Sequence, residues 1–428
     1  MKNKKIEKDL PEVKLLDKYI EDEMIALAVS GGPDSTAMMH IASLSKKIKK
    51  DNVIVVVVDH GLREGSADEV KIVSENAKKL GFKFKTLKWD GLKPNTRIQE
   101  LARKNRYHLI TKWCKTKKIN KIFLAHHLDD QIETFLMRLA KGSGVDGLAS
   151  MDFLSKISDI YLVRPFLEIP KERLLNILDS SKLRWINDPS NFNMNFKRSR
   201  IREITPILAK EGIDSKQISH VIKRMRSASK SLNAQTKIII NKYIHDFKNI
   251  AYFLDKKILT EVEDEEILLR VIEKIIMNIS GSIYPARGFK LKNILFWFFK
   301  EDKVTAKTLN GVVIRKRKND FIFYRELNDC DKSAGIKILT SKYVCWDNRF
   351  SLRANMSKNL EVRALGNAGI SILKEKKILK RQGYKGVPLS AWKTAPGVWS
   401  KKRLISMPTL GYTEKKGLKI YIKIHKNL

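Results

Sequence analysis

The region from Ile25 to about Leu124 alternates short apolar runs with amphipathic segments, and this rhythm limits the fold more than any other feature of the sequence. The apolar runs include IALAVS, NVIVVVVDH and KIFLAHH, and segments such as SADEVKIVSENAKKLG between them have helical spacing. Buried parallel strands contain continuous Val, Ile and Leu runs of this kind. The pattern predicts an α/β fold whose doubly wound parallel sheet is covered by helices.

Three polar stretches follow the predicted strands at the points where those strands end. They are Ser30 to Ser35, Asp59 to Arg63, and His126 to Asp130. Parallel sheets of this type bind ligands beyond the carboxyl ends of their strands, which meet at one edge. The three stretches are therefore predicted to form one ligand-binding rim.

The first stretch reads Ser-Gly-Gly-Pro-Asp-Ser and stands between a predicted strand and a predicted helix. Gly31 and Gly32 permit close backbone approaches, so successive N–H groups can converge on an anion at the start of the helix. The loop lacks the Gly-Lys-Ser/Thr of a Walker loop and the Gly-x-Gly-x-x-Gly of a dinucleotide fold. A phosphate-binding loop is favoured, and an ordinary tight turn is the alternative.

The stretch LAHHLDDQIETF places acidic residues at the start of a predicted helix. Asp130 and Glu133 are three residues apart and share a helix face, so their carboxylates can hold one Mg²⁺ or one ammonium group. The alternative is that these acids only interact with the helix dipole. For His126 and His127 we favour packing or hydrogen bonding over a role as metal ligands.

Two further groups lie on elements that reach the same rim. Asp59 and His60 end a buried strand just before a glycine, which favours a ligand role, with a plain turn as the alternative. Arg103 and Arg106 lie one turn apart on a predicted helix beside Tyr107. Helical arginines usually face solvent, but at this rim they would suit phosphate or carboxylate recognition.

A basic stretch, NDPSNFNMNFKRSRIRE, follows the predicted sheet. Arg198, Arg200 and Arg202 form a patch with Phe192 and Phe196 interleaved. Such interleaving suits stacked nucleotides or tRNA, although it is weak evidence by itself.

The charge of the chain favours a polyanionic partner. The formal net charge is +38, which favours nucleic acid or an anionic membrane surface, although a general lysine bias can account for half of the excess. The 3 cysteines include no Cys-x-x-Cys pair and no Cys/His cluster, which indicates neither a disulfide framework nor a zinc site. A reducing cytoplasm fits this usage, and no apolar run reaches the roughly 18 residues of a membrane span.

The sequence predicts three domains. Residues 1–215 form the doubly wound, Rossmann-like sheet domain, residues 216–335 a mainly helical middle domain, and residues 336–428 a small α+β C-terminal domain. The stretch TLNGVVIRKRKNDFIFYRE is predicted to close the middle domain as a hairpin turning around Lys318 to Asp320.

Several motifs together carry a family resemblance. Ser30 to Ser35 resembles the SGGxDS signature of the PP-loop ATP pyrophosphatases, and Pro33 fills its variable position. The stretches VDHGLREGSADE, AHHLDDQIETFLMRLAKGSGVDGLASM, RPFLEIPKERL, NDPSNFNMNFKRSRIRE and PGVWSKKRLISMPTLGY occur in the order and spacing of tRNA(Ile)-lysidine synthetases. The resemblance covers the chain from about Ile25 to Tyr412.

This resemblance implies an enzyme that ligates lysine to C2 of the wobble cytidine in a tRNA(Ile) with a CAU anticodon. The reaction would use ATP and Mg²⁺, pass through an adenylated cytidine and release pyrophosphate and AMP. The partners implied are this tRNA and free L-lysine, without a membrane, and a homodimer is compatible with the sequence. The middle and C-terminal domains would bind the tRNA body.

The resemblance also assigns roles to individual positions. ATP would be bound by Ser30, Gly31, Gly32, Pro33, Asp34 and Ser35, with Asp59 and His60 on the same rim. Asp34, Asp130, Glu133 and Arg103 would be catalytic, with Asp34 and Asp130 on Mg²⁺. Lysine or tRNA would be bound by Arg106, Arg198, Arg200 and Arg202.

Two other functions compete with this interpretation. A PP-loop enzyme of tRNA thiolation usually recruits cysteines or an iron–sulfur cluster, which Cys114 alone does not offer. A tRNA-binding protein without catalysis would have no use for an ATP loop.

Overall fold

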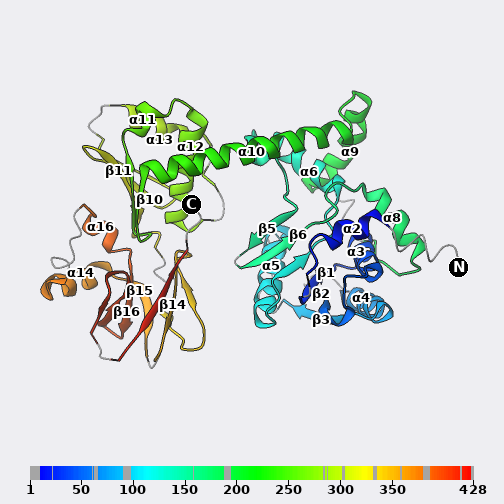
Figure 1. Ribbon diagram of the computed structural model, residues 1–428, viewed down its shortest axis with the longest axis horizontal. Helices are drawn as coiled ribbons and strands as arrows, with labels where there is room; N and C mark the ends of the chain where they lie inside the picture. The colour runs from blue at the N-terminus through cyan, green and yellow to red at the C-terminus, as the bar shows by residue number, and fades with distance from the viewer. Residues whose placement is uncertain are drawn as a thin grey trace. The chain divides into compact units, whose positions relative to one another are not determined.

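A computed structural model of the chain describes residues 10–21, 23–59, 61, 66–89, 98–157, 159–187, 194–282, 285–286, 288–300, 304–330, 335–356, 359–378, 386–414 and 417–425. The chain forms two compact units, Met1–Lys230 and Ser231–Leu428 (Figure 1). The domain boundaries that the sequence predicts near residues 215 and 335, which would give three domains, stay predictions.

The first unit is built on a six-stranded sheet with the order β3-β2-β1-β4-β6-β5. Neighbouring strands are parallel except for β5, which pairs antiparallel with β6 at the edge. The strands are β1 (Ile25–Ala28), β2 (Val53–Asp59), β3 (Lys83–Lys88), β4 (Lys121–Phe123), β5 (Leu154–Ile157) and β6 (Ile160–Val163). The predicted parallel sheet is confirmed.

Nine α-helices lie wholly or partly in the described residues of this unit. They are α2 (Pro11–Asp17), α3 (Pro33–Leu44), α4 (Ser66–Leu80), α5 (Ile98–Thr116), α6 (Leu128–Leu139), α7 (Val145–Leu148), α8 (Lys171–Ser180), α9 (Lys197–Lys210) and α10 (Ser215–Tyr243), which continues into the second unit.

The continuous valine run of β2 is explained by two cores, one on each face of the sheet. Val53, Val55 and Val57 belong to the core that also contains α3 and α8 residues. Ile54 and Val56, which alternate with them, belong to the core that contains α5 residues. Because successive side chains of a strand point to opposite faces, a strand covered on both sides must be apolar at every position.

The order of the strands creates the place where a ligand can bind. From β1 the chain proceeds to β2 and β3 on one side, and it returns to β4 on the other side of β1. The connections that follow β1 and β4 therefore leave the sheet in opposite directions and open a crevice at the strand ends.

The second unit contains a five-stranded antiparallel sheet with the order β7-β8-β11-β10-β9. Its strands are β7 (Ile244–Phe247), β8 (Ala251–Asp255), β9 (Ala306–Leu309), β10 (Val312–Lys316) and β11 (Asp320–Arg325), accompanied by α11 (Ile258–Glu261), α12 (Glu265–Ser280) and α13 (Gly288–Phe299). The predicted hairpin is confirmed, and its turn is closed by a hydrogen bond from Arg317 N to Asp320 O of 2.9 Å. The sequence does not reveal the other strands of this sheet, β7, β8 and β9.

The rest of the second unit is α+β, as predicted. One sheet has the order β12-β15-β16-β17-β18 and a smaller one the order β13-β14-β19. The elements are β12 (Ile336–Lys337), β13 (Val344–Trp346), β14 (Phe350–Ala354), β15 (Glu361–Ala364), α14 (Gly366–Glu375), α16 (Leu389–Trp392), β16 (Pro396–Ser400), β17 (Arg403–Met407), β18 (Tyr412–Thr413) and β19 (Ile420–Ile424). Among the described residues, no helix combines the length and the apolar character of a membrane span.

A buried ion pair links separate segments of the second unit. Arg349 is fully buried, and its Nε atom lies 2.6 Å from Asp347 Oδ2. Its other nitrogens donate to the carbonyl oxygens of Asn249, at 3.1 Å, and Thr394, at 2.8 Å. One guanidinium thus connects the β7–β8 turn, the β13–β14 turn and the segment before β16.

Replacing Arg349 by alanine is expected to destabilise the second unit by about 3 kcal/mol, because it breaks a buried ion pair, leaves Asp347 with the more distant Arg325 at 3.3 Å, and removes the donor to the carbonyl oxygens of Asn249 and Thr394. Urea unfolding followed by tryptophan fluorescence measures this, since Trp346, Trp392 and Trp399 are buried in the adjoining core. The matched control is Arg403→Ala, which removes an exposed ion pair with Glu414 and should leave the unfolding midpoint nearly unchanged. Equal effects of the two substitutions would contradict the prediction.

Candidate functional site

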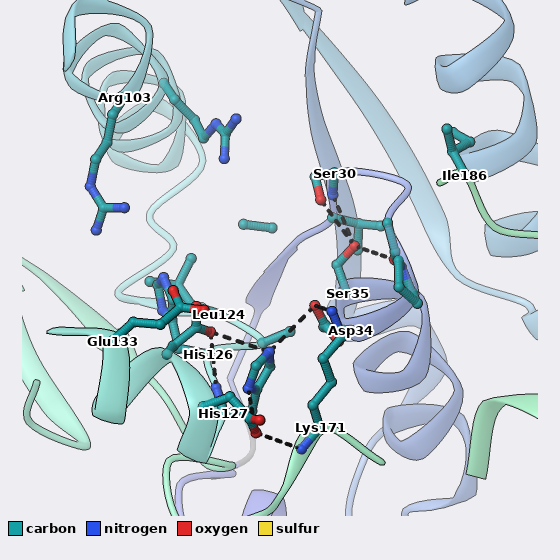
Figure 2. Close-up of a pocket in the computed structure, with 18 of the residues that line it drawn as sticks. Ser30, Asp34, Ser35, Arg103, Leu124, His126, His127, Glu133, Lys171 and Ile186 are labelled. Carbon is teal, nitrogen blue, oxygen red and sulfur yellow. Dashed lines mark hydrogen bonds and ion pairs between the residues drawn. The ribbon is translucent and has the colours of Figure 1, made fainter. Parts of the chain in front are cut away.

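A cavity of about 800 Å³ lies at the carboxyl ends of the sheet strands in the first unit. Its apolar wall comes from the ends of β1, β2 and β4 and from α5. Its polar wall comes from the β1–α3 loop, the start of α6 and the start of α8, where Figure 2 labels Asp34, His127 and Lys171. One face of α9 completes this wall. The structure therefore gathers two of the three polar stretches that the sequence placed on one rim, Ser30 to Ser35 and His126 to Asp130.

The loop from Ser30 to Ser35 wraps around the first turn of α3. Ser30 N donates to Ser35 Oγ at 3.1 Å, and Ser35 Oγ donates to Gly32 O at 3.0 Å. Gly32, Pro33, Asp34 and Ser35 all line the cavity, so the amino end of a twelve-residue helix opens into it. This is the arrangement in which a helix N-terminus binds an anion.

Gly31 is the one position of this loop where only glycine fits. Its φ angle is +86°, in the left-handed region, and a Cβ atom there would stand 2.7 Å from Ile186 Cδ1. Ile186 N also donates to Gly31 O at 2.9 Å, so the segment after α8 packs against the outside of the loop. At Gly32 the nearest atom to an added Cβ is Ser30 Oγ, at 3.6 Å, and φ is ordinary at −70°.

His127 is buried at the centre of three carboxylates. Its Nε2 atom lies 3.5 Å from both Asp34 Oδ2 and Asp130 Oδ2, and its Nδ1 atom lies 3.4 Å from Asp129 Oδ2. Burial alone would lower the pKa of His127, but the neighbouring carboxylates outweigh it and raise the pKa to about 10. The imidazole is therefore a cation at neutral pH, whereas burial lowers the pKa of His126 to about 3 and keeps that ring neutral.

Asp34 and Asp130 form the acidic pair that fits a divalent cation. Burial opposes ionisation of Asp130, but the positive charges of His127 and Arg198 outweigh it and lower its pKa. Asp34 Oδ1 is buried and has no hydrogen-bond partner among the described residues. Two carboxylates beside a phosphate-binding loop are the donor set that Mg²⁺ uses together with substrate phosphates. The described residues include no group of three or more acidic, His or Cys side chains arranged to hold a metal by themselves.

Glu133 is held differently from Asp130, although both line the cavity. Its Oε1 atom lies 2.5 Å from Arg202 Nε, and its Oε2 atom lies 3.7 Å from Arg198 Nε. Burial nevertheless raises the pKa of Glu133, and the two arginines only partly offset that effect. Asp130 lies with Asp34 around His127, and the pairing of Asp130 with Glu133 around one Mg²⁺ or one ammonium group stays a prediction.

The remaining predicted arginines divide into two groups. Arg103 and Arg106 are exposed on α5 and line the cavity with Arg202, and the Arg103 guanidinium lies 5.4 Å from the Tyr107 ring centre. Arg198 and Arg200 are not among the residues that line it. Arg200 instead donates to the carbonyl oxygens of Met194 and Asn195, at 2.7 and 3.1 Å.

Of the middle stretch of the predicted rim, the structure describes Asp59 and Gly61. Asp59 accepts a hydrogen bond of 2.9 Å from Gly61 N, which is the geometry of a turn, and it does not line the cavity. His60, Phe192 and Arg63 lie outside the described residues.

The sequence indicates no role for Asp129, Lys171 and Ile186, which also line the cavity. Asp129 accepts a hydrogen bond of 2.9 Å from Lys171 N; burial opposes its ionisation, but His127 and Lys171 outweigh burial and lower its pKa to about 2. Lys171 Nζ lies 4.0 Å from Asp34 Oδ2, and Ile186 holds the loop at Gly31. The position of Lys171 just after Ile169 and Pro170 marks a helix start, but no local signal shows that this helix faces Asp34.

Comparison with known proteins agrees with this site. The PP-loop domain family matches residues 3–208. The chain is 34% identical over 336 residues to a tRNA(Ile)-lysidine synthase of Wolbachia sp. subsp. Brugia malayi, covering 78% of this chain and 77% of that protein. It is 31% identical to that of Ruegeria pomeroyi, covering 90% and 88%, and 32% identical to that of Rickettsia bellii, covering 91% and 90%. The chain belongs to the tRNA(Ile)-lysidine synthase family.

The part of the chain that matches the PP-loop domain family includes the loop around Gly31. The segment from Ser30 to Ser35, which resembles the PP-loop signature, lies within the matched residues 3–208, and the matched PP-loop domain implies the use of ATP. The motifs that suggested the family also include His127, whose position among the carboxylates only the structure reveals.

Gly31→Ala is expected to lower ATP affinity roughly tenfold or more, because the left-handed conformation costs an alanine about 1–2 kcal/mol and its Cβ would strike Ile186. Isothermal titration with ATP measures the loss. Adding Ile186→Ala removes the clash but leaves the unfavourable φ angle, so it should restore only part of the affinity.

Gly32→Ala provides the matched control for folding. The position has room for a Cβ, so thermal stability should match that of the wild type. A loss of ATP affinity in Gly32→Ala without a loss of stability would locate a phosphate against that backbone. Normal ATP binding by Gly31→Ala would contradict the proposed role of the loop.

Proposed function

We propose that this chain ligates lysine to C2 of the wobble cytidine in a tRNA(Ile) with a CAU anticodon, using ATP. The observation that carries the proposal is one cavity that joins the PP-loop to the Asp34–His127–Asp130 cluster and to the Glu133–Arg202 pair. The relatives named for lysidine synthesis support it, since three of them match 77–90% of their own length.

The proposed reaction has two steps, and neither needs a covalent bond to the protein. In the first, the O2 oxygen of cytosine attacks the α-phosphorus of ATP and pyrophosphate leaves. In the second, the ε-amine of lysine attacks C2, AMP leaves with the former O2 oxygen, and the amine loses a proton. Such steps depend on positioning and on stabilised charge.

Different parts of the cavity have charges that are complementary to different groups of the reactants. We assign the phosphates of ATP to the PP-loop and the amino end of α3, where Gly32 to Ser35 face the cavity. We assign Mg²⁺ to Asp34 and Asp130, where it would neutralise charge on the phosphates. His127 keeps these two carboxylates together before the ligands enter, because its cationic ring lies 3.5 Å from each.

Lysine carries charges of both signs, and the cavity offers partners for both. We assign its ammonium groups to Asp130 and Glu133 and its carboxylate to Arg103 or Arg106, which line the same cavity. Arg202 already occupies one oxygen of Glu133, and the other oxygen is buried without a hydrogen bond among the described residues. That oxygen lies 3.7 Å from Arg198 Nε, and we propose that an entering ammonium group replaces Arg198 beside it.

The cysteines give no support to thiolation. No disulfide joins Cys114, Cys330 and Cys345, and none of these three described residues lines the cavity. Burial raises the pKa of Cys114 to about 12, so its thiol is not a nucleophile at neutral pH. Since tRNA and ATP are cytoplasmic reactants, we place the proposed reaction in the cytoplasm.

The decisive assay incubates the full chain with ATP, Mg²⁺, radiolabelled lysine and tRNA transcripts. Label is expected to enter the isoleucine tRNA with the CAU anticodon and not the elongator methionine tRNA with the same anticodon. Chelation of Mg²⁺ should stop the transfer. Equal labelling of both transcripts, or of neither, would refute the proposal.

Asp130→Asn is expected to reduce lysine transfer by on the order of 100-fold or more, because the site loses a carboxylate placed for charge stabilisation. The tRNA Kd should change little, since the substitution is confined to the small-ligand cavity. The control is Asp159→Asn, which alters an exposed aspartate in a pair with Lys115 outside the cavity. Near-normal transfer by Asp130→Asn would remove Asp130 from the catalytic site.

A further inference from the structure

Helix α13 in the second unit is apolar on two opposite faces. One face packs inward, where Leu291, Ile294, Leu295, Trp297 and Phe298 are buried. The ring of Phe298 stacks on that of Phe321 in β11, with 3.8 Å between the ring centres. In Figure 1 this helix lies with α11 and α12 in the second unit.

The other face of α13 exposes three phenylalanines to solvent. Phe289, Phe296 and Phe299 are 59%, 62% and 56% exposed. Their spacing of seven and three residues puts them on one side of the helix. Among the described residues, these are the phenylalanines with large exposure, so the exposed rings of this kind are gathered on one helix. An exposed aromatic face of this kind marks an interaction site.

Lysines share this face with the rings. Lys292 is one turn from Phe289 and Phe296, and Lys300 Nζ lies 4.5 Å from the Phe296 ring centre. Lys292 pairs with Glu265 at 3.2 Å, but both side chains are more than 60% exposed, so water and salt weaken that pair. Helix α13 itself has two lysines and no acidic residue, Lys300 follows its last residue, and the Arg315 to Lys318 run in the neighbouring hairpin is entirely basic.

We propose that this face, made of Phe289, Phe296, Phe299, Lys292 and Lys300, binds unpaired nucleotides of the RNA substrate. Bases stack on aromatic rings whatever their sequence, and lysines neutralise the phosphates between them. The inference rests on the proposed function in so far as that RNA is a tRNA, whose loops and 3′ end carry unpaired nucleotides.

The charges favour RNA over a second copy of the chain as the occupant. A symmetric contact through α13 would bring the lysines of two copies together, and each copy has a formal net charge of +38. RNA brings phosphates to the same lysines. One RNA ligand would therefore both stack on the rings and pair with the lysines of this face.

The test compares full-length variants for binding to a tRNA transcript over a range of salt concentrations. Phe296→Ala combined with Phe299→Ala is expected to raise Kd by about tenfold or more, because each stacked base contributes substantially to binding. The slope of log Kd against log salt should stay the same. Lys300→Gln should instead reduce that slope by about one.

Three comparisons make the result specific to stacking. Phe296→Tyr with Phe299→Tyr keeps the rings and should bind as the wild type does. Ile238→Ala removes an exposed apolar side chain, 67% exposed on α10, and should have no effect. A blunt RNA duplex has no unpaired nucleotides, so its affinity should be the same for the wild type and the double alanine variant.

Four outcomes would overturn the inference. They are an unchanged tRNA Kd in the double alanine variant, an equal loss of affinity for tRNA and duplex, loss of a dimer in sedimentation with RNA binding intact, and loss of binding to anionic phospholipid vesicles with RNA binding intact. Lysine transfer by the wild type is measured in parallel. Ring-dependent tRNA binding without any transfer would refute the proposed function and leave this inference standing.

Discussion

The buried cation of His127 is the interaction on which the arrangement of the site depends. Three carboxylates from two separate segments converge on one imidazole, at 3.4–3.5 Å. Without a positive charge between them, Asp34, Asp129 and Asp130 would repel one another in a partly buried cavity. The cation therefore holds the start of α3 beside the start of α6, and with it the PP-loop beside the acidic cluster.

The sheet brings the segments of His127 and Asp34 together, because their strands are neighbours. His127 comes four residues after β4, and Asp34 comes six residues after β1, so the pairing of β1 with β4 brings both segments to one edge. The same crossing order that opens the crevice also gives β2 its two covered faces, which is why its sequence is apolar throughout. The apolar run of β2, which indicates the fold in the sequence, and the crevice, which positions the site, thus both result from the strand order.

The sequence predicted what depends on local pattern. The parallel sheet follows from the alternation of apolar and helical segments, and Asp130 in the first turn of α6 follows from acids before an apolar run. The contact of Arg202 with Glu133 joins residues 69 positions apart, and no periodicity encodes it. Strands β7 and β8 have only four and five residues and follow directly on the long helix α10, so a helical pattern masks them.

The charge of the cavity differs from that of the chain as a whole. Six acidic residues line the cavity, and they face Arg103, Arg106, Lys171, Arg202 and the cationic His127. A nearly balanced site does not attract a polyanion by excess charge, although the chain has a formal net charge of +38. The excess must therefore lie on other surfaces, where it can attract RNA phosphates without competing for the cavity. A highly charged nucleotide entering this cavity would then need a further cation of its own, which is the chemical reason for proposing that Asp34 and Asp130 would hold Mg²⁺.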